Sequence, residues 1–268
     1  MMRTKPKRIS EQRQRLLILL AIIILPCLAG TSGMVPTEVE DVPISSPAPA
    51  VEPVSKSLLM GRFKPAENTD FELIHSYNYY PGMYLHKRTK AALDSLVAAA
   101  ARDDIFLNLV SATWSFDLQK TIWERKIKLH GGQHFESLDE DRKRSIITEI
   151  LKSSSMPTTS RHHWGTDVDF CSVELSFWDS PIGKRNLQWL QNNATSYGFN
   201  IVYSSDREGG YSYEPWHWTY LPLSRHYLQE YLRQVSYDDI TGFTGAEFAR
   251  DFDVINEYVA NVSPSLLP

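Results

Sequence analysis

Imidazole and carboxylate side chains gather in two short stretches of this sequence. The first, residues 160–169, reads SRHHWGTDVD, and the second, residues 214–220, reads EPWHWTY. On a strand, Asp167 and Asp169 would point to the same face. Two carboxylates on one face beside an imidazole are costly to bury unless a cation or water receives them. The first stretch therefore predicts a polar site that needs such a partner.

The second stretch supplies another imidazole and another carboxylate. Pro215 is unfavourable inside a helix, so Glu214 and His217 do not form the helical HExxH arrangement of many zinc proteases. On a strand, His217 would face a cleft, while the alternate aromatic residues pack in the core. Two histidines and one aspartate give three nitrogen and oxygen ligands. Zinc with three protein ligands keeps its fourth position for water, as in catalytic sites.

Both stretches resemble the signature motifs of the D-alanyl-D-alanine carboxypeptidase family, SxHxxGxAxD and ExWH. This zinc peptidase group (VanY-like, LAS-type) includes the vancomycin-resistance carboxypeptidases and dipeptidases. It shares its metal-site architecture with lysostaphin-type enzymes and hedgehog domains. The resemblance covers roughly residues 84–222, and the two motifs occur in the family's order.

The resemblance implies one Zn²⁺ per chain, held by His162, Asp169 and His217. Glu214 would be the base that deprotonates the metal-bound water and later protonates the leaving amine. Zinc would lower the pKa of that water towards ~7 and polarise the scissile carbonyl. Ser160 would lie near the bound substrate, where it could hold the terminal carboxylate.

Position 167 departs from the family motif, in which a small residue, usually alanine, is expected. Asp167 is interpreted in two ways. It could accept a hydrogen bond from a ligand histidine and so orient it, or it could replace Asp169 as a ligand.

A second departure lies in residues 111–119, SATWSFDLQ, which resemble the family's SxYRSxxxQ segment. The resemblance implies that Ser111 and Gln119 bind substrate. The family's arginine, which is thought to stabilise the developing oxyanion, is replaced by Trp114. A preorganised donor at such a position is worth about 2.7–4 kcal/mol of barrier in other enzymes. The candidates to replace it are Arg161, Arg125 and Arg207.

The N-terminal residues have the pattern of an export signal. Residues 1–15 carry six basic groups and a single acidic one, and residues 16–30 are uncharged and apolar. A basic segment followed by a ~7–15 residue apolar run is typical of a signal peptide, and the run is shorter than a ~20-residue membrane span. Residues 1–30 are therefore predicted to be a signal peptide or an N-terminal membrane anchor. The protein is expected to be exported to the periplasm or cell envelope, either cleaved or anchored to the inner membrane.

Charge and cysteine content limit the function of the remainder. Without residues 1–15 the chain holds 22 basic and 31 acidic groups, a net charge of about −9. Such a body is unsuited to nucleic acid, whose phosphates require a basic surface. If residues 1–30 were removed, Cys171 alone would remain of the two cysteines, so no internal disulfide is expected.

The pattern of elements predicts an α+β fold with a small, mostly antiparallel sheet that carries the zinc site and is flanked by helices. Residues 31–56, rich in Pro and Ser, are predicted to be a linker, and residues 57–268 the peptidase domain with C-terminal helices. Strands are predicted at 105–111, 166–173, 200–203 and 216–221, and helices at 86–102, 116–129, 138–153, 184–197, 224–234 and 244–259.

These observations predict an exported zinc metallopeptidase that hydrolyses peptidoglycan stem peptides and releases terminal D-alanine. The first alternative is a non-catalytic zinc-containing domain that binds peptidoglycan peptides, which Trp114 favours. The second is a cell-wall endopeptidase. Retention of Glu214 favours an enzyme, because a purely structural zinc site needs no base.

Overall fold

The computed structural model of the chain describes residues 53–267, and a four-stranded antiparallel sheet lies at the centre of this part. Its strand order is β3-β4-β6-β5, from β3 (Leu109–Ser111), β4 (Asp167–Phe170), β6 (His217–Tyr220) and β5 (Phe199–Ile201). A separate antiparallel pair joins β1 (Phe71–Leu73) to β2 (Tyr84–His86). The small antiparallel sheet expected from the sequence is therefore confirmed.

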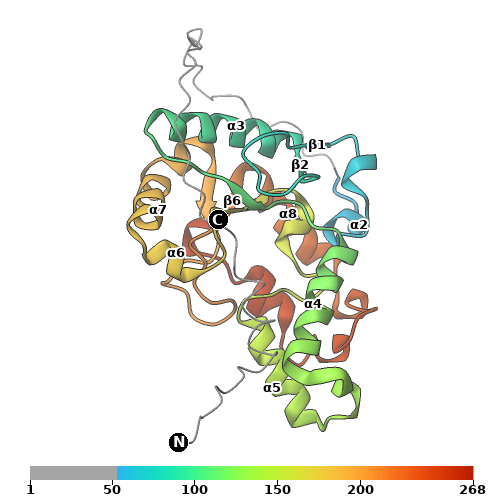
Figure 1. Ribbon diagram of the computed structural model, residues 1–268. Helices are drawn as coiled ribbons and strands as arrows, with labels where there is room; N and C mark the ends of the chain where they lie inside the picture. The colour runs from blue at the N-terminus through green and yellow to red at the C-terminus, as the bar shows by residue number, and fades with distance from the viewer. Residues whose placement is uncertain (1–52, 268) are drawn as a thin grey trace, which may run out of the picture. The chain divides into compact units, whose positions relative to one another are not determined.

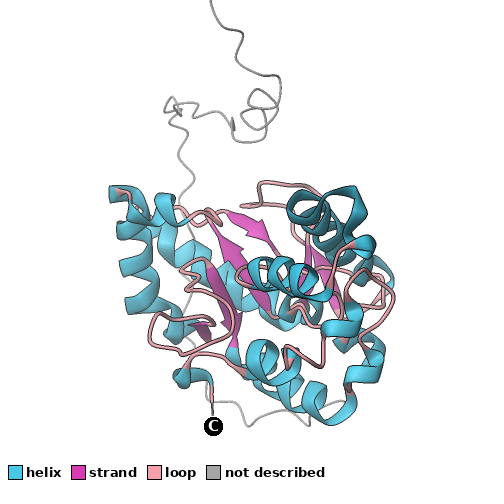
Figure 2. Ribbon diagram, turned by 90° about the horizontal axis from the view of Figure 1, so that it is seen from below, coloured by secondary structure: helices cyan, strands magenta, loops and turns pink. Residues whose placement is uncertain are grey.

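Helices surround this sheet (Figures 1 and 2). The longer ones are α3 (Lys87–Arg102), α4 (Phe116–Gly131), α5 (Glu140–Leu151), α7 (Pro181–Asn193) and α8 (Leu221–Gln234), and the short ones are α2 (Lys56–Leu59) and α6 (Leu175–Asp179). Among residues 53–267, no helix is long and apolar enough to cross a membrane. The predicted signal or anchor at 1–30 and most of the predicted linker lie outside the described residues.

Local sequence signals fix where the helices begin. The Ser115 hydroxyl accepts a hydrogen bond from the Leu118 amide at 3.2 Å and caps α4, and Asp139 accepts one from the Arg142 amide at 2.8 Å and caps α5. Such caps satisfy amides that have no partner within the helix and are worth about 1 kcal/mol each. Pro181 begins α7, at a position where its missing N–H costs nothing.

The sheet has one apolar face and one polar face, as the alternation along β4 requires. Val168 and Phe170 are fully buried and belong to an apolar cluster that includes Leu93 and Leu96 of α3 and Leu190 of α7. A second apolar cluster lies among α2, α4, α5, α8 and the C-terminal residues. With its apolar face packed on helices, the sheet holds its opposite, polar face in a fixed position.

The C-terminal residues differ from the predicted helix at 244–259. Only a single 3₁₀ turn (Ala246–Phe248) and a short π-helix (Ile255–Ala260) form there. Between them Asp253 adopts a left-handed conformation, with φ of 45°, which interrupts the helical path. Apolar residues such as Phe248 and Val259 are nevertheless buried, so the segment packs on the core without forming a continuous helix.

A tight turn after α2 lies against His163. Gly61 has φ of 71°, and a Cβ built on it would lie 2.3 Å from Nδ1 of His163. Both the backbone angle and the lack of space therefore require glycine at this position.

We predict that Gly61→Ala lowers the free energy of unfolding by at least about 2 kcal/mol, because it adds a clash to a strained φ. Gly82→Ala is the matched control, since Gly82 has φ of 82° with nothing within 4 Å of its built Cβ. Urea denaturation of both variants measures the difference. Equal losses of stability would show that the contact with His163 contributes nothing.

Candidate metal centre

The register of the central strands brings the polar residues of both motifs together. β4 and β6 pair so that Asp169 lies opposite His217 and Asp167 opposite Thr219. On the other side of β4, Ser111 of β3 lies opposite Asp169. A row of polar side chains thus crosses three neighbouring strands on one face of the sheet.

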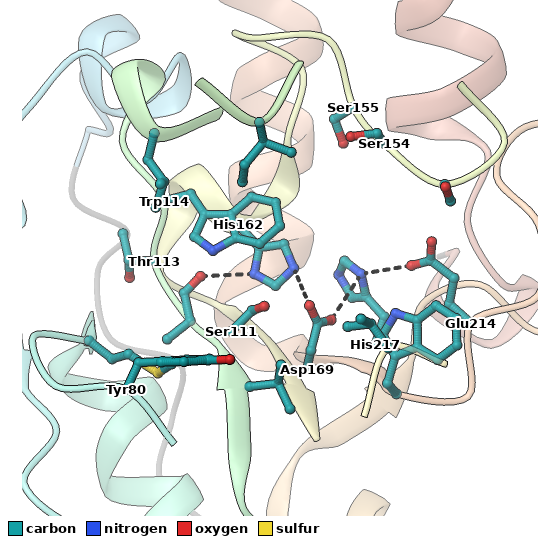
Figure 3. A pocket seen from close by; sticks show the side chains of 18 of the residues that line it. Tyr80, Ser111, Thr113, Trp114, Ser154, Ser155, His162, Asp169, Glu214 and His217 are labelled. Atoms are coloured by element: carbon teal, nitrogen blue, oxygen red, sulfur yellow. Dashed lines mark hydrogen bonds and ion pairs between the residues drawn. The ribbon is translucent and has the colours of Figure 1, made fainter. Parts of the chain in front are cut away.

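His162 reaches this row from a 3₁₀ turn that precedes β4 (Arg161–Trp164). The turn ends at Gly165, whose φ is 66° and whose built Cβ would lie 2.3 Å from the ring of Phe71. Only glycine satisfies both conditions. The turn directs Nε2 of His162 to 3.3 Å from Oδ2 of Asp169 (Figure 3).

His162, Asp169 and His217 form a buried cluster with the composition of a metal site. One ligand atom from each lies within 4.8 Å of the others, and each residue is at most 5% exposed. Oδ1 of Asp169 is buried without a hydrogen-bond partner. An unsatisfied carboxylate oxygen between two imidazoles fits a cation, and a set of two nitrogens and one oxygen suits zinc.

Each histidine uses its other ring nitrogen to contact the protein. Nδ1 of His162 lies 2.9 Å from the carbonyl oxygen of Ala112, and Nε2 of His217 lies 3.0 Å from Oδ2 of Asp167. With protons on these two nitrogens, Nε2 of His162 and Nδ1 of His217 are free to bind a metal. Contacts of this kind fix the tautomer and orientation of ligand histidines.

Asp167 is the centre of a buried polar network beneath the candidate site. Its carboxylate accepts hydrogen bonds from Nε of Arg161 at 2.9 Å, from the hydroxyl of Thr166 at 2.6 Å and from the hydroxyl of Thr219. Burial raises the pKa of Asp167, but the Arg161 guanidinium and His217 outweigh it and hold that pKa well below its usual range. This geometry supports Asp167 as an acceptor that orients His217.

The carboxylates around His217 favour a positive charge on its ring. Burial lowers the pKa of His217, yet Asp167, Glu214 and Asp169 outweigh burial and raise that pKa to about 10. Burial raises the pKa of Asp169, and the neighbouring histidines bring it below its ordinary value. A proton and a metal ion would therefore compete for the free nitrogen of His217.

Glu214 lies beside the cluster, just before β6. Its Oε2 is 3.3 Å from Nδ1 of His217, and the residue is 7% exposed. Its amide donates to the carbonyl of Tyr203 at 3.0 Å, and its own carbonyl accepts from the amide of His217 at 3.2 Å. The tight turn holds the carboxylate at the edge of the candidate metal site, where Figure 3 shows it pointing toward His217.

Trp114 stacks on His162 from above, with ring centroids 4.4 Å apart and an interplanar angle of 22°. Its amide donates to the carbonyl of His162, and its carbonyl contacts Nδ1 of His163 at 2.7 Å. The aromatic ring thus covers one side of a candidate ligand at the position where the family motif has arginine.

The three arginines considered as substitutes lie in different places. Arg161 is paired with Asp167, and Arg207 donates to the carbonyls of Asn261 and Tyr211. Arg125 lies on the wall of the cavity that contains the site, next to Lys126, which the sequence did not single out. Both residues lie on the helix predicted at 116–129, but the packing of that helix against the loop at 153–155 determines that they line the cavity.

A cavity of about 900 Å³ opens over the cluster. Ser111 lines it and lies opposite Asp169 in the sheet. The structure does not place Ser160 or Gln119 on its wall. Ser160 is 1% exposed, and the fully buried Gln119 donates to the carbonyl of Ser155 at 2.7 Å. Gln119 thus supports the loop that lines the cavity.

The chain belongs to the VanY family of D-alanyl-D-alanine carboxypeptidases. The model of this family matches residues 82–223, more than half of the chain, and includes the three residues of the cluster and the adjoining Glu214. The resemblance inferred from the two motifs is therefore confirmed.

Two curated relatives carry the same kind of description. The chain is 30% identical to the putative carboxypeptidase YodJ of Bacillus subtilis (strain 168) over 146 residues, which is 52% of this chain and 46% of that protein. It is 32% identical to a D-alanyl-D-alanine carboxypeptidase of Enterococcus faecium over 88 residues, 32% of this chain and 28% of that one. The chain thus spans less than half the length of these relatives.

Solved structures show partial likeness. A vancomycin-resistance D,D-pentapeptidase VanY in complex with Zn(II) has a TM-score of 0.44 at 23% identity, covering 58% of this chain and 81% of that one. The LD-carboxypeptidase LdcB has a TM-score of 0.47 at 23% identity, covering 76% and 81%. The family assignment comes from the sequence match.

We predict that Asp167→Asn weakens zinc binding by roughly 10-fold to 100-fold, because His217 loses the carboxylate that orients it. Competition with a chelator of known affinity measures the change in the folded protein. Asp179→Asn, which alters an exposed carboxylate, serves as the control. Unchanged affinity in Asp167→Asn would contradict the orienting role.

Proposed function

We propose that this chain is a zinc-dependent carboxypeptidase that removes the terminal D-alanine from peptidoglycan stem peptides. The observation that carries this proposal is the buried cluster of His162, Asp169 and His217 with Glu214 at its edge. Membership of the VanY family supports the substrate class. The zinc complex of a VanY enzyme agrees with the metal that the ligand types favour.

Each candidate residue would have its own role in hydrolysis. When bound, zinc polarises the scissile carbonyl and lowers the pKa of a water molecule. Glu214 would accept a proton from the attacking water and deliver it to the amine of the departing residue. Asp167 and the carbonyl of Ala112 would keep the two histidines in the required orientation.

Trp114 favours a second candidate, a zinc-containing domain that binds stem peptides without cutting them. Its ring covers His162, where the family motif has a cation for the developing oxyanion. Loss of such a donor costs about 2.7–4 kcal/mol of barrier in other enzymes. Glu214 supports the catalytic alternative, since binding alone needs no base beside the metal. An endopeptidase that cuts cross-links is the remaining alternative.

The proposed substrate implies that the enzyme acts outside the cytoplasm. Peptidoglycan lies outside the cytoplasm, so we propose that residues 1–30 direct export, as a cleaved signal or as an anchor. Residues 57–268 would then form the peptidase domain in the periplasm or cell envelope.

Glu214→Gln is expected to lower D-alanine release from muropeptides by about 10²-fold to 10⁴-fold while about one zinc per chain is retained. Mass spectrometry of the released D-alanine measures the activity, and metal analysis measures the zinc. His162→Ala is the comparison variant, which should lose both zinc and activity. Alanine release by Glu214→Gln at the rate of the unmodified chain would show that the base is another group, and a stable protein without zinc would contradict the metal site.

A further inference from the structure

One wall of the cavity is a single face of α4. Leu118, Ile122, Arg125 and Lys126 all line the cavity, and their spacing of four, three and one residues places them on one side of a helix. Trp114 precedes this face at the start of the helix. The wall is thus apolar near His162 and ends in two cations about two turns further along α4.

Lys126 is the more enclosed of these two cations. Its Nζ donates to the carbonyl oxygen of Ser153 at 3.3 Å and to the Ser153 hydroxyl at 3.4 Å. Arg125 is exposed at the rim. Among residues 53–267, neither side chain forms an ion pair with a carboxylate. The charge of Lys126 is therefore available to an anion in the cavity.

Lys126 is hydrogen-bonded to Ser153, and Figure 3 shows the adjoining Ser154 and Ser155 on the side of the cavity where Glu214 lies. Burial lowers the pKa of the Lys126 ammonium group, and the Glu214 carboxylate acts in the opposite direction. Both residues line the same cavity, together with the loop at 153–155. The enclosed cation therefore lies on the side of the cavity where Glu214 would protonate the departing amine.

The chemistry of a terminal residue places its carboxylate on this same side. In the residue that leaves, the amine nitrogen and the carboxylate carbon are bonded to one Cα atom. A proton donor that reaches the nitrogen is therefore close to the carboxylate as well. The Glu214 carboxylate and the terminal carboxylate of the substrate would repel each other at that distance in a partly desolvated cavity. A cation beside them would offset this repulsion.

We propose that Lys126 binds the free terminal carboxylate of the substrate and so selects peptides that end at the scissile residue. This inference rests on the proposed function, since it takes Glu214 as the proton donor. It assigns Lys126 to substrate selection at the leaving residue, a role separate from that of the family's arginine, which Trp114 replaces.

The test compares an N-acetylated tripeptide ending in D-Ala-D-Ala with its C-terminal amide, using the full chain loaded with zinc. Lys126→Gln should lower kcat/KM for the free acid by about 10-fold to 100-fold, mainly through KM, and leave the amide unaffected. Lys126→Arg should retain most of the preference for the acid. Arg125→Gln is the matched control, because it removes the neighbouring cation from the same wall.

Unchanged discrimination between acid and amide in Lys126→Gln would overturn the inference and leave the proposed function intact. So would a loss of discrimination in Arg125→Gln alone. Calorimetric binding of both peptides to the Glu214→Gln protein separates binding from cleavage. Acid-selective binding that Lys126→Gln abolishes would support the inference even if no peptide were cleaved. Equal binding of acid and amide, or binding of neither, would refute it.

Discussion

The structure depends on how three carboxylates are accommodated in a small buried volume. Asp167, Asp169 and Glu214 surround His217, and none is more than 7% exposed. Such a concentration of negative charge is stable only with matching positive charge. Arg161 supplies it for Asp167 through a buried ion pair, and a metal ion would supply it for the others. The pairing of β4 with β6 and the turn before β4 both serve this arrangement.

The chemistry of the site could be predicted from the sequence because its parts are local. Alternation along a strand places Asp167 and Asp169 on one face, and Pro215 excludes a helix at the second motif. The pairing that sets Asp169 opposite His217 could not be derived in this way, because register depends on contacts across the sheet. The two motifs implied that their histidines and carboxylates lie close together, and the pairing of β4 with β6 shows how the strands bring them there.

Features that depend on distant contacts could not be derived from the sequence. Gln119 donates a hydrogen bond to the carbonyl oxygen of Ser155. The spacing of residues in the sequence does not indicate this partner. Lys126 lies by the cavity because α4 packs against the loop at 153–155, and its own segment reads as an ordinary polar helix. The helix expected at 244–259 fails at Asp253, where the backbone turns left-handed although the apolar residues on either side are buried.

The turn after α2 shows that the structural unit is larger than the region that the family model matches. The family match begins at residue 82, yet Gly61 packs on His163, and the carbonyl of Leu59 accepts a hydrogen bond from Nε1 of Trp164 at 3.2 Å. His163 in turn contacts the carbonyl of Trp114, whose ring covers His162. A fragment cut at the family boundary would therefore lose the outer support of the loop that carries His162, so the structural unit includes the end of α2 and the turn after it.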